Sequence, residues 1–219
     1  MNMIRTGLMI AMAMVAFAAP VKADYVVWTD LDTGAHISYP DTWKTINNQQ
    51  PDDIVTLSLP SGEDNAVCRV RANEDRRFLI YPNRFRSDIR DINFTNNFWE
   101  DYTASYDNVN VIRQQNEAGL GQGFASMTLI SFVTPPDEPF ANKAGLMLVT
   151  NYGDQVYVAE CTSNAMNYRK YHTSFLSFFK TISFKPAYSV TTVGNYRNFL
   201  KDWGTINAPL PNTVSRTVY

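Results

Sequence analysis

The sequence is poor in the residues from which catalytic and metal sites are usually built. Its 219 residues include two histidines and two cysteines. A structural zinc site needs four closely spaced ligands, and a redox dithiol needs a CxxC motif. The glycines at 119–123 do not match G-x-G-x-x-G, and they precede a strand pattern where a dinucleotide loop would open a helix. No cofactor or metal is therefore expected.

An excess of positive charge is also missing. The chain has 19 Lys and Arg residues against 21 Asp and Glu residues, and nucleic-acid binding would need a basic patch or stripe. After residue 23 no apolar run approaches the roughly 20 residues that cross a bilayer as a helix. No nucleic-acid partner and no stable membrane span are expected.

The first 23 residues have the three parts of a secretory signal. Arg5 provides positive charge, Leu8–Ala19 is an uncharged apolar run, and Val21-Lys22-Ala23 follows the helix breaker Pro20. The apolar run is short for a membrane anchor and suits a signal core. We expect cleavage after Ala23 and a periplasmic or secreted protein. The remainder keeps 17 basic and all 21 acidic residues, a net charge near −4, because Arg5 and Lys22 precede the cleavage point.

Cys68 and Cys161 are the only cysteines, and each lies in a strand-like segment. In an oxidising compartment an even number of cysteines favours a disulfide over free thiols. We expect a structural disulfide that closes a loop of about 93 residues, worth on the order of 4 to 5 kcal/mol.

Runs of strands interrupted by two helical stretches predict an α+β fold with an antiparallel sheet. Strands are expected at 25–29, 35–39, 54–59, around Cys68, 110–114, 123–133, 144–151, 155–162 and 182–184. Helices are expected at 84–91 and 95–106, and after 163 or 164, where aromatic residues recur at three- and four-residue spacing up to Phe179. We predict a signal peptide at 1–23, one domain at 24–185, and a C-terminal appendix at 186–219, with a short helix and a mobile tail.

Two segments resemble the Mog1/PsbP-like superfamily, which includes bacterial periplasmic proteins of the DcrB type. Residues 35–43 (AHISYPDTW) are similar to its early corner of a strand followed by Tyr-Pro and Trp, and residues 171–184 are similar to its closing helix and Ser-Phe strand. The resemblance implies an antiparallel β-sheet flanked by helices in an α/β/α sandwich. It also implies a binding or assembly role, and it assigns no functional residue of this chain.

The candidate binding surface combines arginines with the aromatic residues of the predicted helices. Its members are Arg76, Arg77, Arg84, Arg86, Phe98, Trp99 and Tyr102. Arg69 and Arg71 lie in the same stretch. Such a neighbourhood could hold an anionic ligand or an acidic partner. The alternative is a core layer of aromatics beside a solvated edge of arginines.

These features favour an exported, non-enzymatic binding or assembly module with a protein partner in the envelope. One alternative is a secreted hydrolase that uses His36 or His172, although His172 is expected at the surface or boundary of its helix. A small-molecule or lipid carrier is a third possibility.

Overall fold

The computed structural model describes residues 24–184, except for positions 49, 80, 82–84, 122, 137, 138 and 140. The predicted signal peptide at 1–23 and the predicted appendix at 186–219 lie outside the described residues. Among the described residues no helix is long and apolar enough to cross a membrane.

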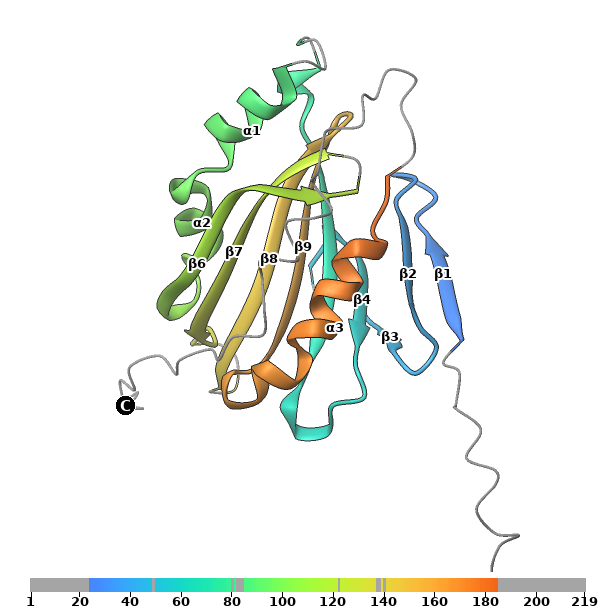
Figure 1. Cartoon of the computed structure of the whole chain (residues 1–219), viewed down its shortest axis with the longest axis vertical. Helices are drawn as coiled ribbons and strands as arrows, with labels where there is room; N and C mark the ends of the chain where they lie inside the picture. Colours follow the sequence, from blue (N-terminus) through green and yellow to red (C-terminus); the bar gives the residue numbers. More distant parts are fainter. Residues whose placement is uncertain are drawn as a thin grey trace, which may run out of the picture.

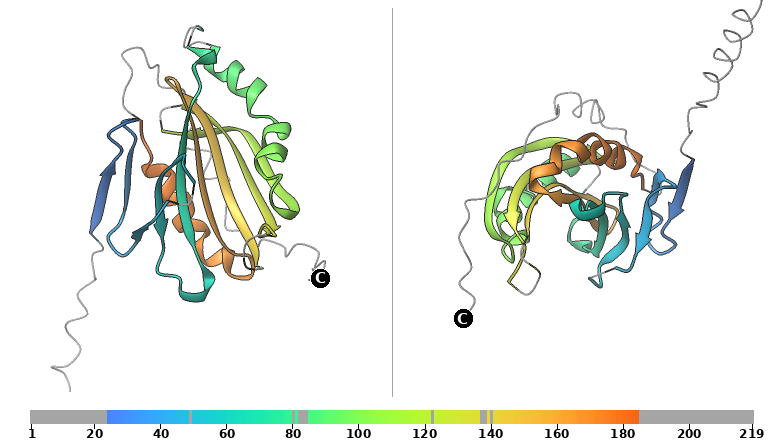
Figure 2. Two further views of the ribbon diagram at one scale, coloured as in Figure 1. Left: turned by 180° about the vertical axis from the view of Figure 1, so that it is seen from behind. Right: turned by 90° about the horizontal axis from the view of Figure 1, so that it is seen from below.

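Two antiparallel sheets make up the β-structure. A small hairpin pairs β1 (Tyr25–Thr29) with β2 (His36–Pro40), as predicted. The large sheet has seven strands in the order β3-β4-β5-β9-β8-β7-β6, and it is curved (Figures 1 and 2). Its strands are β3 (Lys44–Ile46), β4 (Asp53–Ser58), β5 (Val67–Glu74), β6 (Asp107–Leu120), β7 (Gly123–Val133), β8 (Asn142–Tyr152) and β9 (Gln155–Asn164).

Helices lie on both faces of the large sheet, which confirms the predicted α+β class with an antiparallel sheet flanked by helices (Figure 1). One face is covered by α3 (Tyr168–Thr181), and the opposite face by α1 (Arg86–Asn93) and α2 (Asn96–Tyr102). Single 3-10 turns at η1 (Gly62–Asp64), η2 (Arg76–Phe78) and η4 (Ala165–Asn167) complete the described elements.

The aromatic stripe of α3 forms the centre of the main core. Its buried members include Tyr168, Tyr171, Phe175, Phe178 and Phe179, which recur at helical spacing and pack on the sheet. Strands β4 to β9 contribute alternate residues to this core because successive side chains point to opposite faces. The periodicity in the sequence therefore located both the helix and its buried face correctly.

The disulfide is present between Cys68 and Cys161, as predicted. The two residues are direct partners in the β5–β9 ladder, and their Cα atoms are 4.0 Å apart. Both side chains are fully buried in the core beneath α3. The bridge therefore joins two neighbouring central strands that are 93 residues apart in the sequence.

Several boundaries differ from the sequence prediction. The second predicted helix ends at Tyr102, because the chain turns at Thr103 and enters β6 at Asp107. β6 continues to Leu120, well beyond the predicted residue 114. The expected closing strand at 182–184 is wrong, since in that segment only a single bridge forms, between Ser183 and His36.

Candidate functional site

A row of charged residues lies on the sheet face opposite α3. In β5, Cys68 and Val70 point into the main core, so Arg69 and Arg71 must point to the other side. In β9 the same alternation places Glu160 on that face, directly opposite Arg69 in the ladder. α2 covers only part of this face, and the charged residues lie beside it.

The carboxylate of Glu160 is the centre of a buried polar network. It is 3% exposed. Arg69 donates from Nε to Glu160 Oε1 at 2.5 Å, and the hydroxyl of Tyr102 donates to Oε2 at 2.6 Å. Arg69 also donates from Nη2 to the hydroxyl of Tyr106 at 3.3 Å. The network ties the end of α2 and the loop after it to the middle of the sheet.

A second ion pair extends the network towards β4. Arg71 donates from Nε to Oδ1 of the buried Asp53 at 3.0 Å. The Arg71 guanidinium also lies 5.6 Å from the centre of the Tyr102 ring, within the range of a cation–π interaction. Tyr102 therefore contacts both charged pairs.

The protonation states follow from burial and charge. Burial disfavours the charged form of Arg69, but the Glu160 carboxylate, Tyr106 and Tyr102 together outweigh it and raise the pKa of Arg69. Burial, reinforced by the negative charge of Glu160, raises the pKa of Tyr102 and of Tyr106. Both tyrosines remain protonated at neutral pH, so their hydroxyls can donate hydrogen bonds.

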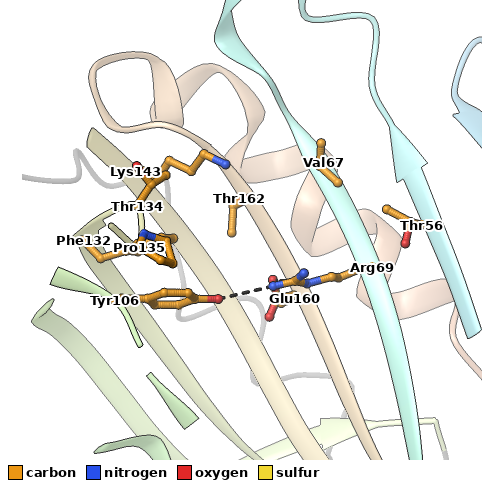
Figure 3. Close-up of a pocket in the computed structure, with 10 residues that line it drawn as sticks. All are labelled: Thr56, Val67, Arg69, Tyr106, Phe132, Thr134, Pro135, Lys143, Glu160 and Thr162. Atoms are coloured by element: carbon orange, nitrogen blue, oxygen red, sulfur yellow. Dashed lines mark hydrogen bonds and ion pairs between the residues drawn. The ribbon is translucent and has the colours of Figure 1, made fainter. Parts of the chain in front are cut away.

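A small pocket opens beside this network (Figure 3). Its volume is about 80 Å³, enough to hold more than one water molecule. We call it the Arg69–Lys143 pocket, after the two cationic side chains that line it. Its other lining residues are Thr56, Val67, Tyr106, Phe132, Thr134, Pro135, Glu160 and Thr162.

The pocket has more donors and more positive charge than its own acceptors use. A guanidinium has five N–H groups, and in the described residues those of Arg69 serve Glu160 and Tyr106 alone. Lys143 extends from β8 into the same space (Figure 3), and within the described part of the chain its ammonium has no ion pair. Among the described lining residues, two cations face one carboxylate, an excess of one positive charge.

The structure separates the residues of the predicted binding surface. Arg76 and Arg77 lie exposed on η2, where they pair with Glu74 and Asp75 rather than lining the pocket. Arg84 and the side chain of Arg86 lie outside the described residues.

The aromatic members lie together on α2. Trp99 is buried and donates its indole N–H to Ser126 Oγ at 3.0 Å. Phe98 packs edge-on against Trp99 and stacks with Tyr102. Of the predicted residues whose side chains the structure describes, only Tyr102 belongs to the charged network, through Glu160. Phe98 and Trp99 belong to the core layer that covers this face of the sheet.

Lys143 and Glu160 were not predicted, although the sequence carries a signal for one of them. Glu160 interrupts the otherwise apolar run of β9, at a position whose neighbours Ala159 and Cys161 are buried. Period-two alternation places it on the same side of the sheet as Val158. An acidic residue there indicates a buried charge that needs a partner.

The two histidines lie away from the pocket. His36 is on β2, where Nδ1 is 2.8 Å from the Thr29 hydroxyl. His172 is buried on α3, with Nδ1 2.9 Å from the hydroxyl of Tyr168. The expected surface or boundary position of His172 is therefore wrong, because its side of α3 faces the sheet. In the described residues no group of three or more His, Cys, Asp or Glu could hold a metal.

Comparison with known proteins concerns the fold. The sequence matches no protein-family model, and it matches no curated protein. The cyanobacterial PsbP protein CyanoP from Synechocystis is similar in structure, with a TM-score of 0.49, 10% identity, and coverage of 78% of this chain and 99% of that one. The Ran-binding protein Mog1p of Saccharomyces cerevisiae has a TM-score of 0.47 and 10% identity, over 74% and 96% of the two chains.

A third similar structure is LpqN of Mycobacterium tuberculosis, which is involved in cell envelope biogenesis. Its TM-score is 0.43 and its identity 9%, over 74% of this chain and 91% of that one. At these identities the likeness extends to the fold alone.

Proposed function

We propose that the protein is an exported, non-enzymatic binding module that holds an anionic group of a partner in the Arg69–Lys143 pocket. The observation that carries the proposal is the surplus of donors and positive charge in a pocket that is partly enclosed by the sheet. Charge-assisted hydrogen bonds to an anion are short and strong, especially from a guanidinium. A carboxylate or a phosphate has the acceptors that the pocket lacks.

The network around the pocket supports binding because it fixes the position of the guanidinium. Arg69 is held by Glu160 and Tyr106, so little side-chain freedom is lost when a ligand binds. Neither His36 nor His172 lines the pocket, so the hydrolase alternative draws no support from it. The third alternative is that the protein carries a small molecule. The titrations described below test this alternative together with partner binding.

Binding at the pocket is tested by NMR titration of the oxidised protein with sodium acetate and with sodium phosphate, at constant ionic strength. We expect selective shifts of the Arg69, Lys143 and Thr162 amides. Lys143→Gln should weaken binding about tenfold, the value of a charged hydrogen bond. The matched control is Lys180→Gln, an exposed lysine of α3 on the opposite side of the sheet. Equal weakening by both variants, or no selective shift, would show that the proposal is wrong.

The exported location rests on two features that agree. Residues 1–23 have the pattern of a secretory signal, and a buried disulfide between central strands is typical of proteins from an oxidising compartment. We also propose that residues 24–185 form one domain and that residues 186–219 are an appendix to it. Expression of the full chain in a Gram-negative host should yield a periplasmic protein that begins at Asp24. A cytoplasmic, uncleaved chain with two free thiols would contradict the proposal.

A further inference from the structure

The outer edge of β1 is exposed and uncharged. β1 is the outer strand of the small hairpin, and it lies at the periphery of the molecule (Figures 1 and 2). Tyr25 is 64% exposed and Val27 is 68% exposed, and the strand Tyr25–Thr29 has no charged side chain. An apolar strand with an open edge is a template for pairing with another chain.

Two backbone hydrogen bonds of the hairpin show which groups of β1 point outward. The Asp41 N–H donates to the Asp24 carbonyl at 2.9 Å, and the Asp30 N–H donates to the Ala35 carbonyl at 2.9 Å. Because every second residue of an antiparallel strand bonds to its neighbour, the even-numbered residues of β1 bond to β2. The N–H and C=O groups of the odd-numbered residues therefore point away from β2. The odd-numbered residues of β1 are Tyr25, Val27 and Thr29.

The outer edge of β2, in contrast, is occupied. His36 and Ser183 exchange two backbone hydrogen bonds of 2.7 and 2.9 Å, and the Ser38 N–H donates to Thr181 Oγ1 at 3.3 Å. His36 and Ser38 are the ladder partners of odd-numbered residues of β1, so their outward direction agrees with the alternation in β1. Among the described strands none but β2 pairs with β1, so the hairpin keeps one open edge.

The two edge strands of the large sheet are protected against a further strand. β3 has three residues and begins with Lys44, and the pairing of β6 with β7 shifts register at three places. Short length, lysine and bulges all discourage the addition of a strand. β1 contains no lysine or proline, and its register with β2 is unbroken over five pairs. It is therefore the edge that is best suited to pairing.

We propose that β1 pairs with β1 of a second copy of this chain. The two strands run antiparallel about a two-fold axis at Val27, and the two hairpins form one four-stranded sheet. Tyr25 lies opposite Thr29 of the second copy, and Val27 lies opposite its own equivalent. Each of these is a hydrogen-bonded pair that exchanges two backbone bonds, so the outward-pointing groups of both strands are satisfied.

The occupant is a second copy because β1 is complementary to itself. Its outward-pointing residues are placed symmetrically about Val27, so a two-fold axis there aligns donors with acceptors. On one side of the sheet Val27 faces its equivalent, and Tyr25 faces Thr29. On the other side Val26 faces Trp28. Aromatic and β-branched residues are favourable cross-strand partners.

The ends of the strand select this register. A shift by two residues in either direction would leave an outward-pointing residue of each β1 without a β1 partner. In the unshifted register Asp24 lies opposite Asp30, whose carboxylate already accepts two hydrogen bonds from Thr33, at 2.8 and 2.6 Å. Cleavage after Ala23, as proposed above, gives Asp24 a positive α-amino group that offsets the repulsion between the two carboxylates.

The proposed dimer is small and therefore weak. A strand of five residues is a much smaller contact than the about 20 to 30 residues that each partner brings to a standard interface. We expect a dimer that forms and dissociates with protein concentration. No residue of β1 lines the Arg69–Lys143 pocket, so dimerisation and anion binding are independent proposals.

Sedimentation equilibrium of the exported, oxidised protein measures the dimer, whose fraction should rise with concentration. Val27→Pro should weaken it about thirtyfold, because it removes both N–H donors at the two-fold axis and none that bonds to β2. Val27→Lys should weaken it about tenfold, because two ammonium groups then lie opposite each other. The matched control is Leu31→Lys, at a residue 93% exposed in the turn after β1, which should dimerise like the wild type.

Cross-linking tests the register. The Cα atoms of a hydrogen-bonded antiparallel pair are about 5.5 Å apart, within the range of about 4.4 to 6.8 Å that a disulfide spans. Val27→Cys should therefore form a disulfide-linked dimer when oxidised glutathione is the oxidant. Tyr25→Cys, at a similarly exposed position, should stay uncrosslinked because its partner in the second copy is Thr29.

Three results would overturn the proposal. The first is a protein that stays monomeric at every concentration, and the second is a dimer that both substitutions of Val27 leave unchanged. The third is cross-linking of Tyr25→Cys as fast as that of Val27→Cys, which would contradict the two-fold axis at Val27. None of these results bears on acetate binding at the Arg69–Lys143 pocket, which is measured separately.

Discussion

The two faces of the seven-stranded sheet bury different kinds of side chain. The face under α3 is apolar: Leu57, Cys68, Leu146 and Phe175 are buried there without any exposed surface. The opposite face carries buried charges, of which Glu160 lies in the middle of the sheet, and it keeps two cavities beside α2. The first face supplies the hydrophobic free energy of folding, and the second holds polar groups at a fixed position.

This contrast has an energetic consequence. Burial of an ion pair costs desolvation that its Coulombic attraction repays only in part, so well-packed apolar residues would often be as stable or more stable. The polar face is therefore not where the fold gains most of its stability. Stability should depend mainly on the α3 face, and ligand binding mainly on the other.

The disulfide should have the largest effect on stability, and it belongs to the α3 face. Replacement of Cys68 and Cys161 by alanine should lower the free energy of unfolding by about 4 to 5 kcal/mol, because the bridge closes a long loop in the unfolded chain. Urea unfolding of the oxidised protein and of the double variant measures the difference. The reduced wild type serves as the control and should unfold like the variant. A loss below about 1 kcal/mol would mean that the unfolded chain is already constrained.

Truncation in the α3 core should come next. Phe175→Ala should cost about 3 to 5 kcal/mol because the ring is fully buried against the sheet and leaves a cavity. Met166→Ala is the matched control, since Met166 is 76% exposed and its removal should cost less than about 0.5 kcal/mol. Both values come from urea unfolding. Similar losses of unfolding free energy in the two variants would show that the α3 face is not the main source of stability.

On the polar face, replacing Glu160 alone should lower the free energy of unfolding more than replacing Glu160 and Arg69 together. Glu160→Gln should destabilise the protein by about 2 to 3 kcal/mol, because it leaves the largely buried Arg69 without its counter-charge. The double variant Glu160→Met with Arg69→Met should be less destabilised than Glu160→Gln alone, because both charges are removed. Urea unfolding measures stability, and acetate titration should show that the double variant no longer binds. If the double variant loses as much unfolding free energy as the two single variants lose in sum, the two residues are not energetically coupled.

The smallest effect should come from the part-buried hydrogen bond between Tyr171 and Asp64 on the α3 side. The hydroxyl of Tyr171 donates to Asp64 Oδ2 at 2.6 Å and, as the largest cause, lowers the pKa of that carboxyl. A lowered pKa in the folded state means that the contribution is present above about pH 4 and is lost as pH falls through the folded value.

Asp64→Asn should therefore be slightly less stable than the wild type at pH 7, and the difference should vanish at low pH. Thermal unfolding between pH 2 and pH 7, at low salt, measures it. Asp41→Asn, at an exposed aspartate of the β2–β3 turn, is the control and should follow the wild type at every pH. A difference that persists at low pH would show that the Asp64→Asn substitution perturbs the turn itself.

Much of the fold could be predicted because its signals are local. Alternation in β5 and β9 and the spacing of Tyr171, Phe175 and Phe178 in α3 depend only on neighbouring residues. The pairing of Cys68 with Cys161 followed from the presence of two cysteines and no others. The end of the second predicted helix was missed because Thr103 and Ala104 carry no strong helix-breaking signal.

The candidate pocket was not predicted from the sequence. An anion-binding surface rich in arginine and aromatic residues was expected, but Arg76 and Arg77 pair with their own neighbours in the sequence. The pocket instead takes Arg69 from β5 and Lys143 from β8.

The sequence by itself determined most of the strands and helices, the apolar faces of β5, β9 and α3, and the two cysteines that can pair. The strands, the helices and their apolar faces can be read from the sequence because side chains repeat every two residues in a strand and every 3.6 residues in a helix. The tertiary structure alone decided that Arg69, Lys143 and Glu160 share one pocket and that Tyr106 lines both this pocket and a larger cavity beside α2. The reason is the strand order β5-β9-β8-β7-β6: hydrogen bonding between distant strands, not spacing along the chain, brings these side chains together.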